Sequence, residues 1–145
     1  MILLASYFEC EDKARAEEYK LTLLNNTKNK YIDKIYLFLE SDIAPDIQDE
    51  KIEIIPDTGR PTYNDLLSFC NDNLVGKNCI IANGDIEFTD SLSIIYNEDL
   101  KDCFLCLSRW DLKENGSLVC FDEVQAGFFR MGTLYKKTNT DNWVF

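Results

Sequence analysis

The sequence contains no histidine, and basic residues are much rarer than acidic ones. Of its 145 residues, 15 are lysine or arginine and 26 are aspartate or glutamate, which gives a formal net charge of −11. Proteins that bind nucleic acid usually carry a basic stripe, and this sequence shows none, so nucleic-acid binding is not expected. The same negative charge disfavours attachment to anionic membranes.

Long apolar runs are also missing. No stretch approaches the roughly 20 residues of a membrane-spanning helix, and the first residues lack the basic start and apolar core of a signal peptide. There are six cysteines, of which only Cys103 and Cys106 form a C-x-x-C pair. Without histidine or a second such pair, a zinc site is not expected. Free thiols are typical of a reducing compartment, which predicts a cytoplasmic protein.

Short apolar runs alternate with helical patterns along the whole chain. This alternation predicts an α/β fold with a mostly parallel central sheet flanked by helices. The hydrophobic content of 46% fits one domain over residues 1–145. Strands are expected at 2–8, 34–39, 51–55, 79–82 and 103–108, with further pieces at 118–121 and 127–131. Helices are expected at 11–26, 62–76 and 90–95, the first ending at Asn25-Asn26 and the second beginning with a capping box of Thr62 and Asp65.

Two carboxylates, Asp85 and Glu87, follow the apolar run of residues 79–82. In an extended chain, side chains two residues apart point the same way. The pair can therefore converge on one hard cation, Mg²⁺ or Mn²⁺, whose remaining ligands are substrate phosphates. The alternative is that both acids are ordinary turn residues, because Asn83-Gly84 is itself a turn signal.

Several motifs stand in the order seen in one enzyme family. They are Arg15-Ala16-Glu17-Glu18-Tyr19, the strand at 32–40, the segment 60–65, the segment 80–92 and Leu107-Ser108-Arg109-Trp110-Asp111. Together they make residues 1–111 resemble small GT-A-type glycosyltransferases of the family 2 kind, with an N-x-D-I-x-F variant of the Asp-x-Asp motif. The resemblance implies a single Rossmann-like GT-A domain. It also implies metal-dependent transfer of a sugar from a nucleotide-diphosphate donor to a hydroxyl of a sugar or protein acceptor.

The resemblance assigns roles near the donor. Asp85, with Asn83 of the same motif, is expected to meet the Mn²⁺ or Mg²⁺ ion or the donor, and Glu87 is a second candidate metal ligand. Because both the protein and the donor are anionic, the site needs either a bridging cation or local arginines. Ser6 and Tyr7, at the end of the first strand, are expected to line the nucleoside pocket, with Tyr7 stacking on the base; alternatively, Tyr7 is simply a core residue.

Other basic and aromatic residues are candidates for binding the donor or the sugar. Arg15 would face back toward the strand ends and hold the diphosphate, or else pair with neighbours on its own helix. Arg60 precedes a helix N-terminus, where anions bind, or is an ordinary loop charge. Arg109, Trp110 and Asp111 follow a predicted strand, where Trp110 can form a sugar platform and Asp111 can bind hydroxyls; alternatively, Trp110 is partly buried at the sheet edge.

An inverting transferase needs a carboxylate base. The resemblance indicates Asp141, in the segment 141–145, while Asp122 or Glu123 can equally serve. The chain has no late histidine to complete a metal site and no acceptor-binding region, so a minimal or truncated enzyme is one reading. A catalytically inactive binding module that dimerises through its apolar C-terminal segment is the other. A nucleotidyltransferase is disfavoured, because no glycine-rich phosphate loop with Lys or Arg lies near the first strand.

Overall fold

The computed structural model describes residues 1–56, 59–101, 103–105, 109–112 and 118–121. By its internal contacts the chain divides into two units, Met1–Asp99 and Leu100–Phe145. The first unit carries a four-stranded sheet of order β3-β2-β1-β4, and every pairing in it is parallel. The strands are β1 (Ile2–Tyr7), β2 (Lys34–Leu39), β3 (Ile52–Ile55) and β4 (Cys79–Ala82). The predicted α/β class with a mostly parallel sheet is therefore confirmed.

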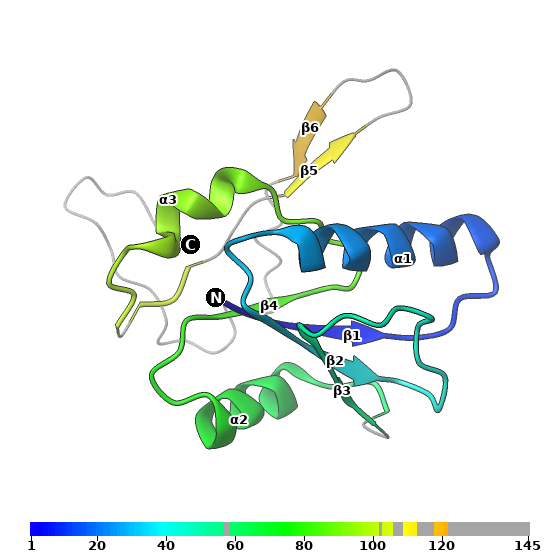
Figure 1. Cartoon of the computed structure of the whole chain (residues 1–145), viewed down its shortest axis with the longest axis horizontal. Coiled ribbons are helices and arrows are strands. Elements are labelled where there is room, and N and C mark those ends of the chain that lie inside the picture. The colour runs from blue at the N-terminus through cyan, green and yellow to red at the C-terminus, as the bar shows by residue number, and fades with distance from the viewer. Residues whose placement is uncertain (57–58, 102, 106–108, 113–117, 122–145) are drawn as a thin grey trace. The chain divides into compact units, whose positions relative to one another are not determined.

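Helices cover both faces of this sheet (Figure 1). Helix α1 (Lys13–Lys28) lies on one face and α2 (Tyr63–Asn73) on the other. Leu4 and Phe38 point from the sheet into a core with Leu66 and Leu74 of the α2 region. Alternation then directs the neighbouring residues of each strand to the α1 face. The structure also contains the short helices η1 (Asp90–Leu92) and α3 (Ser93–Tyr96).

The start of α2 follows a local sequence signal, whereas the end of α1 depends on tertiary contacts. Helix α2 begins at the predicted capping box, in which Thr62 and Asp65 each bond the other's backbone N–H. Helix α1 is capped by Asp12, whose side chain accepts from the N–H of Ala14 at 2.9 Å. The prediction that α1 ends at Asn25-Asn26 is wrong, because the helix continues to Lys28. Both asparagine side chains find partners outside the helix, which offsets their low helix propensity.

The predicted fifth strand is also wrong where the structure describes it. Residues 103–105 are not in a strand, and Phe104 and Leu105 are exposed. The second unit instead has β5 (Arg109–Leu112) paired antiparallel with β6 (Leu118–Phe121). The latter matches the predicted piece at 118–121, whereas the piece predicted at 127–131 lies outside the described residues.

Candidate functional site

The candidate site lies where the strand order of the sheet reverses. The chain runs outward from β1 to β2 and β3, and then returns to place β4 on the other side of β1. In open α/β sheets, ligands bind outside the carboxyl ends of the strands at such a reversal. Ser6 and Tyr7 end β1, and Asn83, Gly84 and Asp85 directly follow β4. Sequence and topology therefore bring the same residues to one place.

The backbone turns as soon as β4 ends. The N–H of Ile86 donates to the carbonyl of Asn83 at 3.2 Å, which closes a turn over Gly84 and Asp85. Because this stretch is not extended, the rule that places residues two apart on one face does not apply to Asp85 and Glu87. The turn that the Asn83-Gly84 signal indicated is the conformation present.

Asp85 and Glu87 contact different parts of α1. One oxygen of Asp85 pairs with the Arg15 guanidinium at 3.2 Å, in the first turn of the helix. Glu87 accepts a hydrogen bond from the Asn25 amide at 2.9 Å, roughly 15 Å further along the helix axis. The two carboxylates therefore have different partners on α1, and their convergence on one cation stays a prediction.

The second carboxylate oxygen of Asp85, Oδ1, takes no part in the pair with Arg15. Its side chain is 20% exposed, and Oδ1 is shielded from solvent yet has no hydrogen-bond partner within the described part of the chain. Buried carboxylate oxygens are nearly always satisfied by a donor, a water or an ion. Asp85 Oδ1 is thus a buried acceptor that the described residues leave unsatisfied.

Arg15 and Tyr19 form the α1 side of the site. The Arg15 guanidinium lies 5.8 Å from the centre of the Tyr19 ring. Hydrogen bonding to Tyr19, followed by attraction to Tyr19 and then to Asp85, raises the pKa of Arg15. Burial raises the pKa of Tyr19, so its hydroxyl stays protonated at neutral pH. Arg15 therefore pairs with Asp85, which follows β4, and contacts Tyr19 on its own helix, whereas its binding of a diphosphate stays a prediction.

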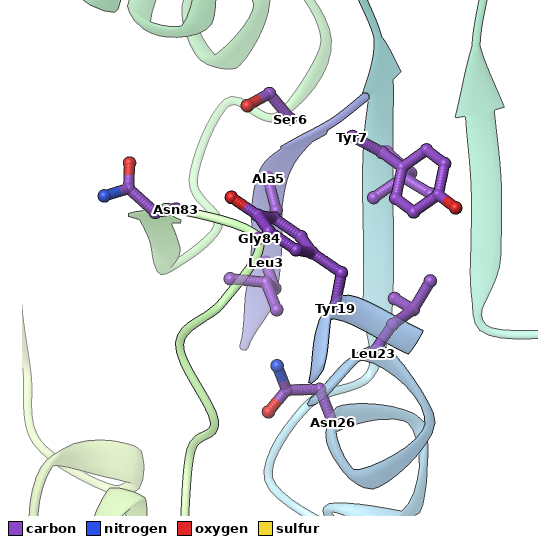
Figure 2. A pocket seen from close by; sticks show the side chains of 10 residues that line it. Leu3, Ala5, Ser6, Tyr7, Tyr19, Leu23, Asn26, Asn83 and Gly84 are labelled. Carbon is purple, nitrogen blue, oxygen red and sulfur yellow. The ribbon is translucent and has the colours of Figure 1, made fainter. Parts of the chain in front are cut away.

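A small cavity lies between the end of β1, helix α1 and Asn83-Gly84 (Figure 2). Ser6, Tyr7 and Tyr19 are among the residues that line it. Burial and the nearby Glu9 raise the pKa of Tyr7, so Tyr7 is a neutral lining residue. The cavity volume of about 10 Å³ is room for roughly one water molecule. A base or a sugar does not fit inside it and would have to lie over its mouth.

Gly84 is packed too closely to carry a side chain. A Cβ built at Gly84 would lie 2.6 Å from the backbone oxygen of Ser6 and 2.8 Å from the Tyr19 ring. The turn after β4 is therefore pressed directly against β1 and α1. Gly84, Tyr19 and Asn26 also shape this site, although the sequence motifs did not identify them as site residues. The sequence pattern that could have indicated Tyr19 and Asn26 is their spacing from Arg15, which places all three on one face of a helix.

The residues fit a metal ion only in part. Within the described ranges, no group of three or more His, Cys, Asp or Glu side chains could hold a metal. Asp85 Oδ1 remains as one suitable oxygen. A magnesium-like ion can be held by one or two carboxylates when substrate phosphates and water supply the other ligands, and this is the kind of binding that Asp85 allows.

The remaining predicted site residues are spread over the chain. Arg60 is exposed and precedes α2; it lies at the end of β3, which two strands separate from β4 in the sheet. Arg109, Trp110 and Asp111 belong to β5 of the second unit, and the structure describes their backbone alone. Asp122, Glu123 and Asp141 lie outside the described residues, as does the apolar C-terminal segment.

Comparison with protein-family models, with curated proteins and with solved structures finds no match to this chain. Across the described residues, no helix combines the length and the apolar character needed to cross a bilayer.

Proposed function

We propose that this chain is a metal-dependent glycosyltransferase of the GT-A type, which binds a nucleotide-diphosphate sugar at the carboxyl ends of β1 and β4. One observation carries the proposal. Arg15 and Asp85 lie 70 residues apart in the sequence and meet at the strand-order reversal, and there one buried oxygen of Asp85 has no hydrogen-bond partner among the described residues. A cation and an anionic ligand are what these two side chains can bind.

Each residue has a role in this proposal. Asp85 Oδ1 would hold Mn²⁺ or Mg²⁺, which neutralises charge on the leaving nucleoside diphosphate when it is bound. Arg15 is half exposed, so its planar guanidinium can move from Asp85 to the diphosphate oxygens. Tyr7 and Ser6 would contact the nucleoside at the cavity mouth. Glu87 reaches the same cation only by leaving Asn25, so we assign Asp85 as the principal protein ligand.

The acceptor side of the reaction involves residues beyond the first unit. A carboxylate must take the proton of the acceptor hydroxyl, and Asp122 and Asp141 remain the proposed candidates, with Glu123 as an alternative to Asp122. Arg109, Trp110 and Asp111 remain proposed sugar-binding residues, and Arg60 a proposed phosphate-binding residue. These assignments rest on the sequence resemblance and on no contact in the structure.

A second candidate is a binding module with the same ligand but no transfer activity. The observation that favours it is the tight packing around Gly84, which leaves room for roughly one water molecule. An enzyme that holds its donor in a deep pocket would be expected to have more space here. The same module could dimerise through its C-terminal segment.

Thermal unfolding with UDP or GDP, each with and without Mn²⁺, tests the proposal. A ligand present at 100 times its dissociation constant stabilises a protein by about 2.7 kcal/mol, which raises the midpoint by several degrees for a chain of this size. We expect the rise only when nucleotide and Mn²⁺ are both present. Asp85→Asn should abolish it. Asp72→Asn, which removes an exposed carboxylate near the end of α2, should leave it unchanged.

The outcomes separate the two candidates. A metal-dependent rise together with release of nucleoside diphosphate from a donor sugar supports the transferase. The same rise without turnover on any donor and acceptor supports the binding module. No rise with either nucleotide at millimolar concentration would overturn both.

A further inference from the structure

The last two turns of α1 hold the segment that follows Asp85. The Asn26 amide nitrogen donates to the carbonyl of Ile86 at 2.9 Å, and the N–H of Phe88 donates to the Asn26 side-chain oxygen at 2.9 Å. Residues 86–89 belong to no strand. A single carboxamide therefore binds this backbone at two alternate residues, as a neighbouring strand would.

Asn26 is buried where an asparagine is costly. It is only 3% exposed and lies inside a helix, where asparagine is a poor helix former. A buried amide is tolerated when both of its ends are hydrogen-bonded. The partners also fix its chemistry, because Ile86 offers an acceptor and Phe88 a donor. Asparagine matches both, whereas leucine matches neither and an ionised aspartate matches only Phe88.

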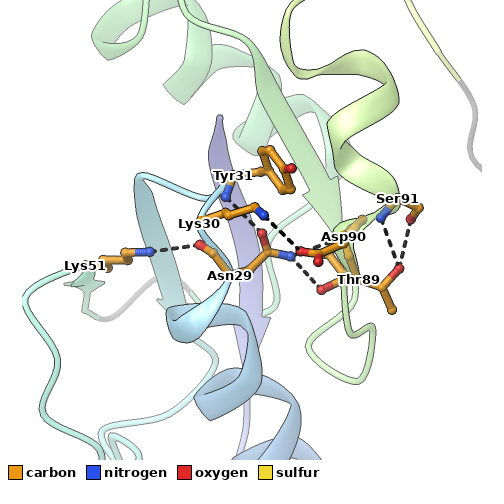
Figure 3. Close-up of polar contacts among 8 residues, drawn as sticks. Asn29, Lys30, Tyr31, Lys51, Thr89, Asp90 and Ser91 are labelled. Carbon is orange, nitrogen blue, oxygen red and sulfur yellow. Dashed lines mark hydrogen bonds and ion pairs between the residues drawn. The ribbon is translucent and has the colours of Figure 1, made fainter.

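Asn29 extends the same attachment by one turn (Figure 3). Its amide nitrogen donates to the carbonyl of Phe88 at 2.7 Å and lies 3.3 Å from that of Thr89. Its side-chain oxygen accepts from the N–H of Tyr31 at 2.9 Å, and its own carbonyl accepts from the Lys51 ammonium at 2.9 Å. Residues 86–89 are thus bound by buried side chains of one helix.

Asp85 lies between two fixed points. Before it, Gly84 is pressed against Tyr19 of α1; after it, the carbonyl of Ile86 is bound by Asn26. The direct contact of Asp85 with α1, through Arg15, is half exposed and so exchanges readily with solvent or ligand. The backbone attachment is the part that sets where its carboxylate points.

We propose, on the basis of the proposed function, that Asn26 is a positioning residue for Asp85. Its carboxamide fixes the backbone at Ile86 and Phe88, and thereby directs the Asp85 carboxylate toward Arg15 and toward the place of the cation. Asn26 itself touches neither the cation nor the nucleotide. Loss of its N–H donor should weaken cation binding through displacement of Asp85 alone.

Asn26→Asp tests this at a pH at which the introduced carboxyl group is ionised, because an ionised aspartate keeps the shape of the side chain and lacks the donor to Ile86. The control is Leu66→Ala, which destabilises the core on the opposite face of the sheet. Two measurements are made below the melting temperature of both variants: the affinity for Mn²⁺ with UDP, followed by Mn²⁺ paramagnetic resonance, and the carbon NMR signal of the Asp85 carboxyl group without ligand. We expect Asn26→Asp to weaken Mn²⁺ binding at least tenfold and to move the Asp85 signal toward that of an exposed aspartate. Leu66→Ala should change the affinity less than twofold and leave the signal in place.

The two measurements distinguish failure of this inference from failure of the proposed function. If the wild type binds no Mn²⁺ with UDP, the proposed function fails for that nucleotide, and the Asp85 signal alone decides on Asn26. If Asn26→Asp leaves the signal and the affinity unchanged, the positioning role is overturned while the proposed function stands. If Asn26→Asp does not fold, Asn29→Ala replaces it. That variant should move the Asp85 signal in the same direction by a smaller amount, and an unmoved signal overturns the inference.

Discussion

Gly84 is the position at which a single methyl group should have the clearest effect. In Gly84→Ala, the added carbon would lie 2.6 Å from the Ser6 backbone oxygen and 2.8 and 2.9 Å from two atoms of the Tyr19 ring. Carbon normally stays at least roughly 3.3 Å from a carbonyl oxygen. The Ser6 oxygen belongs to the backbone of β1, which pairs with strands on both sides, so it cannot yield by rotating a side chain.

The cost follows from two opposing effects. Overpacking of this kind destabilises the folded state by about 1–3 kcal/mol. Replacing glycine also restricts the unfolded chain, which raises the free energy of unfolding by about 0.4–1 kcal/mol. The net loss should be about 1–2 kcal/mol. Urea unfolding, with a slope of about 1–3 kcal/mol per molar for small proteins, should show a midpoint lower by roughly 0.5–1 M at an unchanged slope.

Gly76 supplies a matched control with a different cause. Its Cβ would meet nothing within 4 Å, but its φ is +75°, a conformation that disfavours alanine. Asparagine tolerates this conformation. Gly76→Asn should therefore cost less than Gly76→Ala, whereas Gly84→Asn should cost more than Gly84→Ala. An unchanged midpoint in Gly84→Ala, or a recovery in Gly84→Asn, would refute the close packing of the turn against β1.

Three further predictions use other parts of the chain. Glu87→Gln should keep most of the Mn²⁺-dependent stabilisation by UDP that Asp85→Asn loses, and equal loss in both variants would show that the two carboxylates share the ion. Thr62→Ala should destabilise by about 1 kcal/mol in urea unfolding. In the wild type, the hydrogen bonds between Asp65 and Thr62 lower the pKa of Asp65. The contribution of Asp65 to the free energy of unfolding should therefore be present at neutral pH and fade as the pH falls through that lowered pKa. Burial, with Cys79 nearby, raises the pKa of Cys70 to about 12; less than about one part in a thousand is then thiolate at pH 8.5. Mass spectrometry after brief iodoacetamide treatment should find the exposed Cys103 alkylated well before Cys70.

The predicted elements of the first unit depend on local signals, and these are the ones that the structure reproduces. Thr62 and Asp65 satisfy each other's backbone within one turn of α2, so no distant residue is needed to start that helix. The strand at 34–39 is apolar from Ile35 to Leu39 and becomes the interior strand β2. Where the energy of an element comes from its own residues, the sequence alone is enough.

The failures lie where distant residues decide. Asn25-Asn26 reads locally as the end of a helix, yet α1 continues because Glu87, Ile86 and Phe88 bind those side chains. The apolar run that begins at Cys103 reads as a buried strand, but residues 103–105 do not lie in a strand. Local apolarity cannot tell whether a sheet edge is available.

The candidate site was predictable in composition but not in geometry. Ser6, Tyr7 and Asn83 line one cavity, as parallel strands whose carboxyl ends share one edge of the sheet predict. That Asp85 and Glu87 share a cation remains a prediction, but side-chain alternation does not support it, because alternation holds only in extended backbone and the turn at Gly84 interrupts it. A two-residue spacing of acids after a turn signal therefore predicts the place of a site better than its set of ligands.

The bonds around Asp85 differ in how easily they can be exchanged, and this difference is what ligand binding would use. Arg15, the cationic partner of Asp85, is half exposed, and an ion pair to an exposed side chain contributes little because water can replace that partner. The bonds of Asn26 are buried, so breaking them leaves unpaired donors and acceptors at a cost of about 1–3 kcal/mol each. An arriving cation and diphosphate would therefore separate Asp85 from Arg15 before they disturbed the backbone. The carboxylate would keep its position while its partner changed, which is the preorganisation that a site exchanging one charge for another requires.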